Sequence, residues 1–370
     1  MEKNIKVLIV GSHSSVKGGI TSVIDRFLNY NWNDIEVELL STYIEGNFIK
    51  KIFFFLRGFL KFIKMLIKND FDIAHIHMSY KGSFFRKYLI VKFSKLFKKK
   101  VILHLHGSEF EIFYNNSNQK IKNMIKNLLE SVDSVIVLGE NWERIIKSIA
   151  PNAKIDIFKN AVNVPDYKAQ WSDEKINILF LGVLIKRKGI YELIEAINEL
   201  NKNGVIKNKK LNFLIAGSGI EEKSIKNKIN EYNISYCVEM LGWINRDMKE
   251  MLFNKSQIFI LPSYNEGLPM AILEAMSYGI PVISTDVGSV SEVVINDKTG
   301  YLISPGSIKE IIESIKLIIA NENAWKAKSS ICKKIIEEEF NEEKYFKMQY
   351  GTDLENNRAH DSDVVHFWCG

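Results

Sequence analysis

The chain has 370 residues, which is enough for two domains of ordinary size. Hydrophobic residues make up 46% and charged residues 25% of it, a globular mixture that excludes a largely disordered chain. Its three cysteines are too few for a disulfide framework and have no metal-binding spacing, which is typical of a reducing compartment.

The formal charge of +6 is distributed unevenly. Residues 1–170 contain 26 basic and 16 acidic side chains, a net charge of +10, and the remaining residues have a net charge of −4. The first half therefore suits an anionic partner, and it contains no recognised nucleic-acid-binding module. The sequence shows no signal peptide and no apolar run long enough for a transmembrane helix, so we expect a cytoplasmic protein.

Short β-branched segments alternate with helical patterns along the chain, which predicts parallel sheets covered by helices on both faces. The first series of predicted strands is Ile5–Val10, Ile35–Leu40, Ile73–His77, Val101–His106 and Ser134–Leu138. The second is Ile176–Leu181, Leu211–Ala216, Val238–Leu241, Gln257–Leu261 and Pro281–Ser284. Predicted helices include Gly19–Asn29, Ile121–Ser131, Ile190–Asn201, Glu221–Tyr232, Asp247–Asn254 and Pro269–Tyr278. Two such series indicate two Rossmann-like, doubly wound α/β domains over residues 1–164 and 165–350, followed by a tail of unknown purpose over 355–370.

A basic and aromatic helix is predicted over Phe48–Lys68, and its cations recur on one face: Lys50, Arg57, Lys61, Lys64 and Lys68. The segment Phe84–Lys100 adds seven further basic residues. Such helices bind anionic membrane surfaces, so these two segments predict peripheral attachment. The alternative is an ordinary helix packed on the sheet with its lysines in water.

The segment from Leu261 to Leu302 carries the strongest chemical pattern. Glu266 lies on the loop after a predicted strand, and Glu274 lies within the helix that follows. Ligands of open α/β folds bind at such loops, and the free N–H groups of a helix start favour a phosphate. The carboxylate of Glu274 could accept hydrogen bonds from the two hydroxyls of a ribose.

This segment closely resembles the signature of family 4 retaining glycosyltransferases of the GT-B fold, of the type found in bacterial capsule, exopolysaccharide or O-antigen synthesis. Glu266 and Glu274 match the E-x7-E motif, and the flanking EG-x-P, EAM-x-x-G-x-PV and G-x-x-x-E-V-V elements are present. The resemblance implies two domains facing across a cleft, with the second holding the nucleotide-sugar. It also implies that Glu266 holds the donor sugar and Glu274 the ribose.

The same resemblance extends to a loop that binds the donor diphosphate, GVLIKRKG over Gly182–Gly189. Lys188 matches the lysine of the family. Val183 stands where many members have arginine, so we expect Arg187 or Lys186 to supply the missing cation.

Further donor-binding positions follow from the resemblance alone. In the second domain they are Gly217 and Gly219 in a strand-to-helix turn, Trp243 and Ile244 beside the nucleobase, and Gly267 and Leu268 at a helix start. In the first domain Gly18 and Gly19 resemble the glycine turn that faces the diphosphate, and His106 resembles the histidine near the anomeric carbon.

No metal or other cofactor is expected. His75 with His77, and His104 with His106, share strand faces, but no Cys, Asp or Glu stands near them at ligand spacing. The DFD sequence over residues 70–72 precedes a predicted strand, whereas the metal-binding D-x-D motif of the other large glycosyltransferase fold follows one.

The predicted function is therefore a hexosyltransferase-type transfer, with retention, from a UDP- or GDP-linked sugar to an acceptor hydroxyl. A lipid-linked saccharide is the expected acceptor, and the inner face of the plasma membrane is the expected location. Two alternatives stay open: a sugar-nucleotide epimerase of the same fold, and a catalytically dead nucleotide-binding scaffold.

Overall fold

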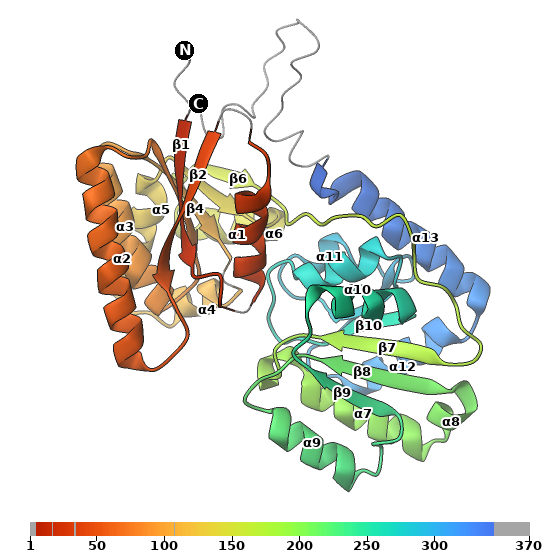
Figure 1. Cartoon of the computed structure of the whole chain (residues 1–370). Coiled ribbons are helices and arrows are strands. Elements are labelled where there is room, and N and C mark those ends of the chain that lie inside the picture. The colour runs from red at the N-terminus through yellow and green to blue at the C-terminus, as the bar shows by residue number, and fades with distance from the viewer. Residues whose placement is uncertain (1–4, 17, 33–34, 107, 344–370) are drawn as a thin grey trace, which may run out of the picture. The chain divides into compact units, whose positions relative to one another are not determined.

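The computed structural model describes residues 5–16, 18–32, 35–106 and 108–343. The chain divides into two compact units, residues 1–160 and 161–370, and each contains a six-stranded parallel sheet (Figure 1). The tail predicted over residues 355–370 lies outside the described residues.

The sheet of the first unit has the strand order β2-β1-β3-β4-β5-β6. Its strands are β1 (Ile5–Ser12), β2 (Ile35–Tyr43), β3 (Ile73–Met78), β4 (Lys100–Leu105), β5 (Ser134–Val137) and β6 (Ile155–Ile157). Its helices are α1 (Gly19–Asn29), α2 (Phe48–Lys68), α3 (Gly82–Leu96), α4 (Phe110–Asn115), α5 (Gln119–Ser131) and α6 (Glu140–Ile149).

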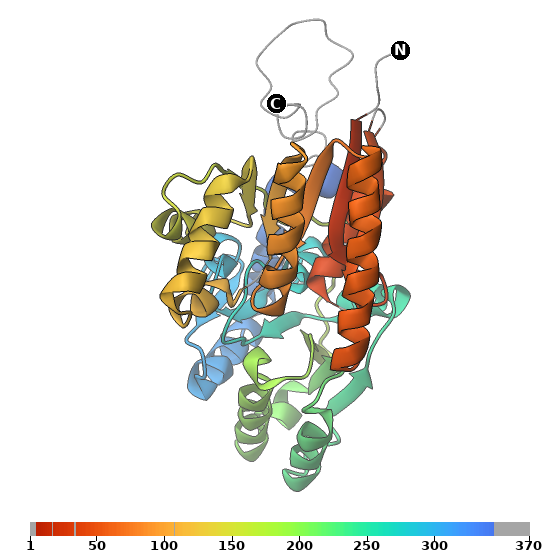
Figure 2. The ribbon, with the colours of Figure 1, turned by 90° about the vertical axis from the view of Figure 1, so that its left-hand side faces the viewer.

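The two faces of this sheet are covered differently. Residues of α2, α3, α5 and α6 share one hydrophobic core against one face, and α2 and α3 lie side by side there (Figures 1 and 2). The other face carries α1, whose buried Phe27 contacts the rings of His75, His77 and His104 edge-on. Since β1 lies between β2 and β3, the chain reverses its direction of winding at the β1–β3 pair, where open sheets bind ligands.

The second unit repeats this architecture with the strand order β12-β11-β10-β7-β8-β9. Its strands are β7 (Ile176–Leu181), β8 (Leu211–Ala216), β9 (Val238–Gly242), β10 (Ile258–Leu261), β11 (Val282–Thr285) and β12 (Gly300–Ile303). Its α-helices are α7 (Ile190–Lys202), α8 (Val205–Lys209), α9 (Glu222–Glu231), α10 (Arg246–Lys255), α11 (Met270–Ser277), α12 (Ile308–Ile319) and α13 (Glu322–Glu339). Two short 3-10 turns, η1 (Lys186–Lys188) and η2 (Val290–Glu292), complete it.

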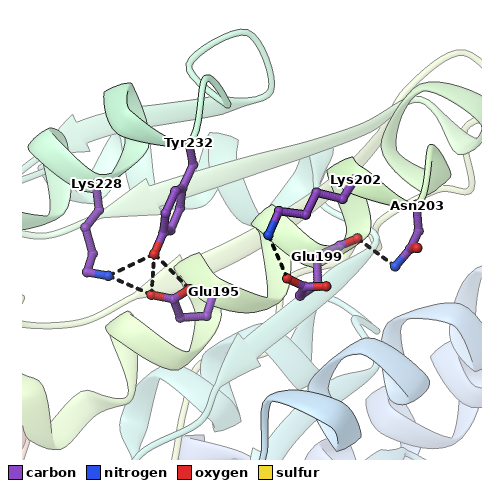
Figure 3. Close-up of polar contacts among 6 residues, drawn as sticks. All are labelled: Glu195, Glu199, Lys202, Asn203, Lys228 and Tyr232. Atoms are coloured by element: carbon purple, nitrogen blue, oxygen red, sulfur yellow. Dashed lines mark hydrogen bonds and ion pairs between the residues drawn. The ribbon is translucent and has the colours of Figure 1, made fainter.

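Polar contacts join α7 to α9, two neighbouring helices of this unit (Figure 3). The Lys228 ammonium lies 2.6 Å from a carboxylate oxygen of Glu195, and the Tyr232 hydroxyl donates to the same carboxylate at 2.7 Å. The strands β7 and β10 are neighbours although they are far apart in sequence. The loops that follow them therefore meet at the carboxyl edge of the sheet.

All ten predicted strands are observed, with ends within three residues of the expected ones, so the predicted fold class is confirmed. The strands β6 and β12 were not predicted. They lie at sheet edges and are only partly buried, so neither is the fully buried run seen in the similarly short central strands β10 and β11.

Candidate functional site

The candidate site of the second unit is built from two loops at the carboxyl edge of its sheet. The turn after β7 packs directly on the loop after β10, where the Arg187 guanidinium donates to the carbonyl oxygen of Asn265 at 2.7 Å. Gly189 has a φ of 68°, and a Cβ atom there would lie 1.9 Å from the carbonyl oxygen of Pro262. Only glycine fits this approach, so the two loops hold each other in place.

Lys188 and Glu266, which stand 78 residues apart in sequence, form an ion pair in this edge. The Lys188 Nζ lies 2.5 Å from Glu266 Oε1, and the side chains are only 16% and 9% exposed. The Ser263 hydroxyl donates to the same oxygen at 2.6 Å, and the Thr285 hydroxyl donates to the Ser263 carbonyl. Lys188 and Glu266, both predicted as site residues, are therefore in contact, and hydrogen bonds from Ser263 and Thr285 hold the loop that carries Glu266. Ser263 was not singled out from the sequence, because its role depends on this loop conformation.

The second glutamate of the motif also has a cationic partner. Glu274, on α11, lies 2.7 Å from the Lys249 ammonium of α10, and its side chain is 15% exposed. The helix α11 has neither an acidic residue in its first turn nor a side-chain cap, so its positive end is available to an anion. Gly267 and Leu268 lead into this end, and the Leu268 side chain is buried. Only the backbone of Leu268 could reach a ligand.

The remaining predicted donor residues of the second unit lie after neighbouring strands. Cβ atoms at Gly217 and Gly219 would lie 1.8 Å from the Gly182 carbonyl oxygen and 2.2 Å from that of Leu184. The packing of the loops therefore requires glycine at both positions. Contact of these two residues with the donor stays a prediction. Trp243, which follows β9, is 48% exposed, and Ile244 is half-buried.

In the first unit Gly18 and Gly19 form the start of α1. A Cβ atom at either would have no neighbour within 4 Å, and the first turn of α1 has no acidic residue. This helix start is therefore open and electropositive, as a contact with a diphosphate would require.

His106 follows β4 and belongs to a stack of four imidazoles. Its Nε2 lies 2.8 Å from Nδ1 of His77, and His75 Nε2 lies 3.4 Å from His104 Nδ1. Desolvation lowers the pKa of both His106 and His75 to about 3, so these rings are neutral at pH 7. A neutral imidazole donates a hydrogen bond from one ring nitrogen and accepts one at the other, so in this contact one of the two rings is the donor and the other the acceptor.

Three of these histidines offer ring nitrogens within 4.8 Å of one another: His75, His77 and His104. All three are buried, and no Cys, Asp or Glu belongs to this group. Three neutral imidazoles are also a ligand set that binds zinc in other proteins, so the expected absence of a metal stays a prediction.

Residues 166–338 match the family model described as "Glycosyl transferases group 1". These residues form a group 1 glycosyltransferase domain. The predicted enzyme class, a glycosyltransferase, is thereby confirmed, and the Lys188–Glu266 pair and Glu274 lie within the matched range.

Relatives of this glycosyltransferase include the UDP-Gal:alpha-D-GlcNAc-diphosphoundecaprenol alpha-1,3-galactosyltransferase of Escherichia coli. That protein is 27% identical over 77% of this chain and 76% of its own. The putative colanic acid biosynthesis glycosyltransferase WcaL of Escherichia coli is 26% identical over 50% of this chain and 47% of its own. Sucrose-phosphate synthase from Thermosynechococcus elongatus has the same fold, with a TM-score of 0.78 at 17% identity over 92% of this chain and 96% of that one.

The basic segments of the first unit present a mixed surface. Several large apolar side chains of α2 are exposed: Phe48, Ile49, Ile52, Phe53, Leu56, Leu60 and Ile67. In the second basic segment Lys87 and Lys99 are buried at 2% and 7% exposure, so these two cations are not on the surface, and membrane binding through this segment stays a prediction. Among the described residues, no helix has the length and apolar character needed to cross a membrane.

Proposed function

We propose that this glycosyltransferase transfers a hexose, with retention, from a UDP- or GDP-sugar to a hydroxyl of a lipid-linked saccharide in bacterial surface polysaccharide synthesis. The contact between Lys188 and Glu266 at the sheet edge is the observation that carries the proposal. This contact supports the proposal because a cation suited to a leaving diphosphate and a carboxylate suited to a sugar hydroxyl lie side by side.

The proposed roles divide between the two units. Lys188, Arg187 and the open starts of α1 and α11 stabilise the developing charge of the leaving diphosphate, and no metal is needed. Glu266 holds the donor sugar, Glu274 accepts hydrogen bonds from the ribose, and His106 lies near the anomeric carbon.

The proposed reaction follows same-face substitution. The bond from the anomeric carbon to the diphosphate oxygen breaks, and a bond to the acceptor oxygen forms on the same face of the sugar. The proton of the acceptor hydroxyl passes to the departing diphosphate oxygen, so no protein base is required.

The proposed acceptor and location have two supports. The galactosyltransferase relative is named for a diphosphoundecaprenol-linked acceptor, and WcaL is named for colanic acid biosynthesis. The exposed apolar and basic side chains of α2 suit an anionic membrane, which would hold the enzyme at the inner face of the plasma membrane.

Replacing Glu266 by Gln tests the proposal. The amide keeps the shape of the side chain but removes the charge beside Lys188, so we expect turnover to fall by about a hundredfold or more. Transfer from UDP- and GDP-sugars to a diphosphate-linked saccharide would be measured, with retention read from the anomeric configuration of the product by NMR.

Glu195→Gln is the matched control, because Glu195 also pairs with a lysine but lies on α7 in the contact shown in Figure 3. It should change stability by a similar small amount and leave turnover unaltered. Wild-type turnover in Glu266→Gln would exclude the proposed site, and donor turnover without an acceptor would indicate an epimerase.

A further inference from the structure

Three basic side chains gather beside the carboxyl end of β2 in the first unit: Lys51, Arg86 and Lys87. The deepest is Lys87 of α3, which is 2% exposed. Its ammonium donates to the hydroxyl of Thr42, and among the described residues this is its one hydrogen-bond partner for three N–H groups. A buried ammonium with so little compensation is costly unless an anion joins it.

The other two cations lie around the neighbouring ring of Tyr43. The Arg86 guanidinium lies 5.0 Å from the ring centroid, and the Lys51 ammonium lies 5.5 Å from it. Arg86 is half-buried, and its Nε is buried without a hydrogen-bond partner in the part of the chain that the structure describes. No ion pair connects Lys51, Arg86 or Lys87 to any described carboxylate.

The surrounding backbone adds to this positive charge. The helix α3 begins close to Arg86, and it has neither an acidic residue in its first turn nor a side-chain cap. Its positive end therefore reinforces the two cations that follow, whereas surface helices usually place acids there. Burial lowers the pKa of Lys87 well below its usual value, and the charge of Arg86 lowers it further.

The cluster lies at the edge of the sheet where ligands of this architecture bind. Thr42 also donates to the carbonyl oxygen of Gly11 at the end of β1, beside the β1–β3 switch point. The charge of Lys87 contributes to lowering the pKa of His77, the hydrogen-bond partner of His106. A group bound by these cations would therefore lie near His77 and His106 of the first unit.

We propose that Lys51, Arg86 and Lys87 bind the diphosphate of a lipid-linked acceptor, an inference that rests on the proposed function above. Two lysines and the planar guanidinium of Arg86 suit a ligand with several phosphoryl oxygens and more than one negative charge. The chain around Lys51 also supplies a place for the lipid, since Phe48, Ile49 and Phe53 are 76%, 77% and 71% exposed. A membrane headgroup fits less well, because the buried Lys87 cannot reach a bilayer surface.

Arg86→Gln and Lys87→Met test this site through binding of farnesyl diphosphate, with farnesol as the neutral probe. Each variant should weaken farnesyl diphosphate binding about tenfold to a hundredfold, as expected for a lost charge-assisted contact, and leave farnesol binding unchanged. Lys126→Met, which removes an exposed cation from α5, is the control and should change neither affinity. Arg86→Gln keeps the test valid if Lys87→Met does not fold, because Arg86 is only half-buried.

Two further arms separate the competing explanations. If Lys188→Met abolishes farnesyl diphosphate binding and Arg86→Gln does not alter it, the diphosphate occupies the donor loop and the proposal is overturned. It is equally overturned if Arg86→Gln weakens sedimentation with phosphatidylglycerol vesicles but not farnesyl diphosphate binding, which would assign the cluster to headgroups. A wild-type protein that binds farnesyl diphosphate as expected but transfers no sugar to any lipid-linked saccharide would overturn the proposed function and leave this anion site standing.

Discussion

The pKa values of single histidines in the imidazole stack of the first unit make the folding stability depend on pH. Burial holds the pKa of His75 near 3 and lowers those of His77 and His104 well below the usual 6.5. Between these values and 6.5 the unfolded chain binds more protons than the folded one. The contribution of these histidines to folding stability is therefore complete above about pH 6.5 and is lost as the pH falls.

We expect the free energy of unfolding to fall by up to about 1.4 kcal/mol per pH unit for each such histidine below pH 6.5. Urea unfolding measured from pH 7.5 to pH 4.5 would reveal this slope. His104→Phe should reduce it, and His13→Gln, outside the stack, should not. A flat profile in the wild-type protein would mean that the imidazoles are accessible to protons in the folded state.

Two glycines give opposite predictions. Alanine at Gly189 would place its Cβ against the Pro262 carbonyl at a positive φ, so we expect a loss of about 2 kcal/mol or more in stability and separation of the two loops. Alanine at Gly19 meets no atom within 4 Å and should leave stability unchanged, while weakening the donor affinity if the diphosphate approaches that backbone. Thermal unfolding and donor titration of both variants would measure the two effects, and equal melting temperatures for the two would contradict the steric argument.

For single residues, the sequence predicts which side chains belong to the site but not which side chains they contact. Glu266 and Lys188 were both predicted as site residues, yet nothing in their spacing predicts that they form an ion pair, because the contact depends on β10 lying beside β7. The burial of Lys87 could not be predicted from the sequence either. A lysine on an amphipathic helix is normally solvated, and only the packing of α3 on the sheet removes Lys87 from water.

Among the elements, α2 is the one whose surface departs most from an ordinary soluble helix. Its buried side is formed by Phe62, Met65 and Leu66, and the opposite side divides into an apolar strip and a basic strip. The apolar strip is Ile49, Phe53, Leu56, Leu60 and Ile67, and the basic strip is Lys50, Arg57, Lys61, Lys64 and Lys68. Exposed apolar strips of this kind are typical of interaction surfaces.

Replacing Phe53 and Leu60 by Ser should therefore weaken binding to phosphatidylglycerol vesicles by at least about tenfold, since each side chain would bury apolar area in the lipid. Sedimentation with vesicles at low and high salt would separate this effect from the contribution of the lysines, which salt screens. Leu317→Ser, at an exposed leucine of the second unit, is the control. Indifference of the wild-type protein to anionic vesicles would exclude the membrane proposal.

Helices and long strands were predictable because their hydrophobic periods extend over enough residues. The predicted bounds of α1, α2, β7 and β8 agree with the observed ones, whereas the partly buried edge strands β6 and β12 were missed. Helix α2 was predicted with its basic face, but the sequence did not indicate which of its many apolar residues would remain exposed. That division depends on the position of the helix on β2 and α3.

For the whole molecule, donor binding should stabilise one unit specifically. The predicted nucleotide contacts belong mainly to the second unit, so UDP or GDP at a hundred times its dissociation constant should add about 2.7 kcal/mol to the stability of that unit. Differential scanning calorimetry with each nucleotide would identify the base. Glu274→Gln should reduce the shift if its carboxylate holds the ribose. No shift with either nucleotide would favour a protein without a working donor site.

Two repeated series of strands and helices were enough to predict two parallel sheets, and the sequence motif was enough to predict the enzyme class. The substrates are not predictable in the same way. They depend on side chains such as Lys51, Arg86 and Trp243. Residues of these types bind many ligands, and their structural surroundings decide which one.

The apolar strip of α2 also has a consequence for enzyme kinetics. An enzyme held on a bilayer by this strip would meet lipid-linked acceptors by diffusion in two dimensions, at a local concentration set by their mole fraction in the lipid. Its rate would then follow surface dilution with inert lipid, and a Michaelis constant expressed in bulk molar units would not describe it.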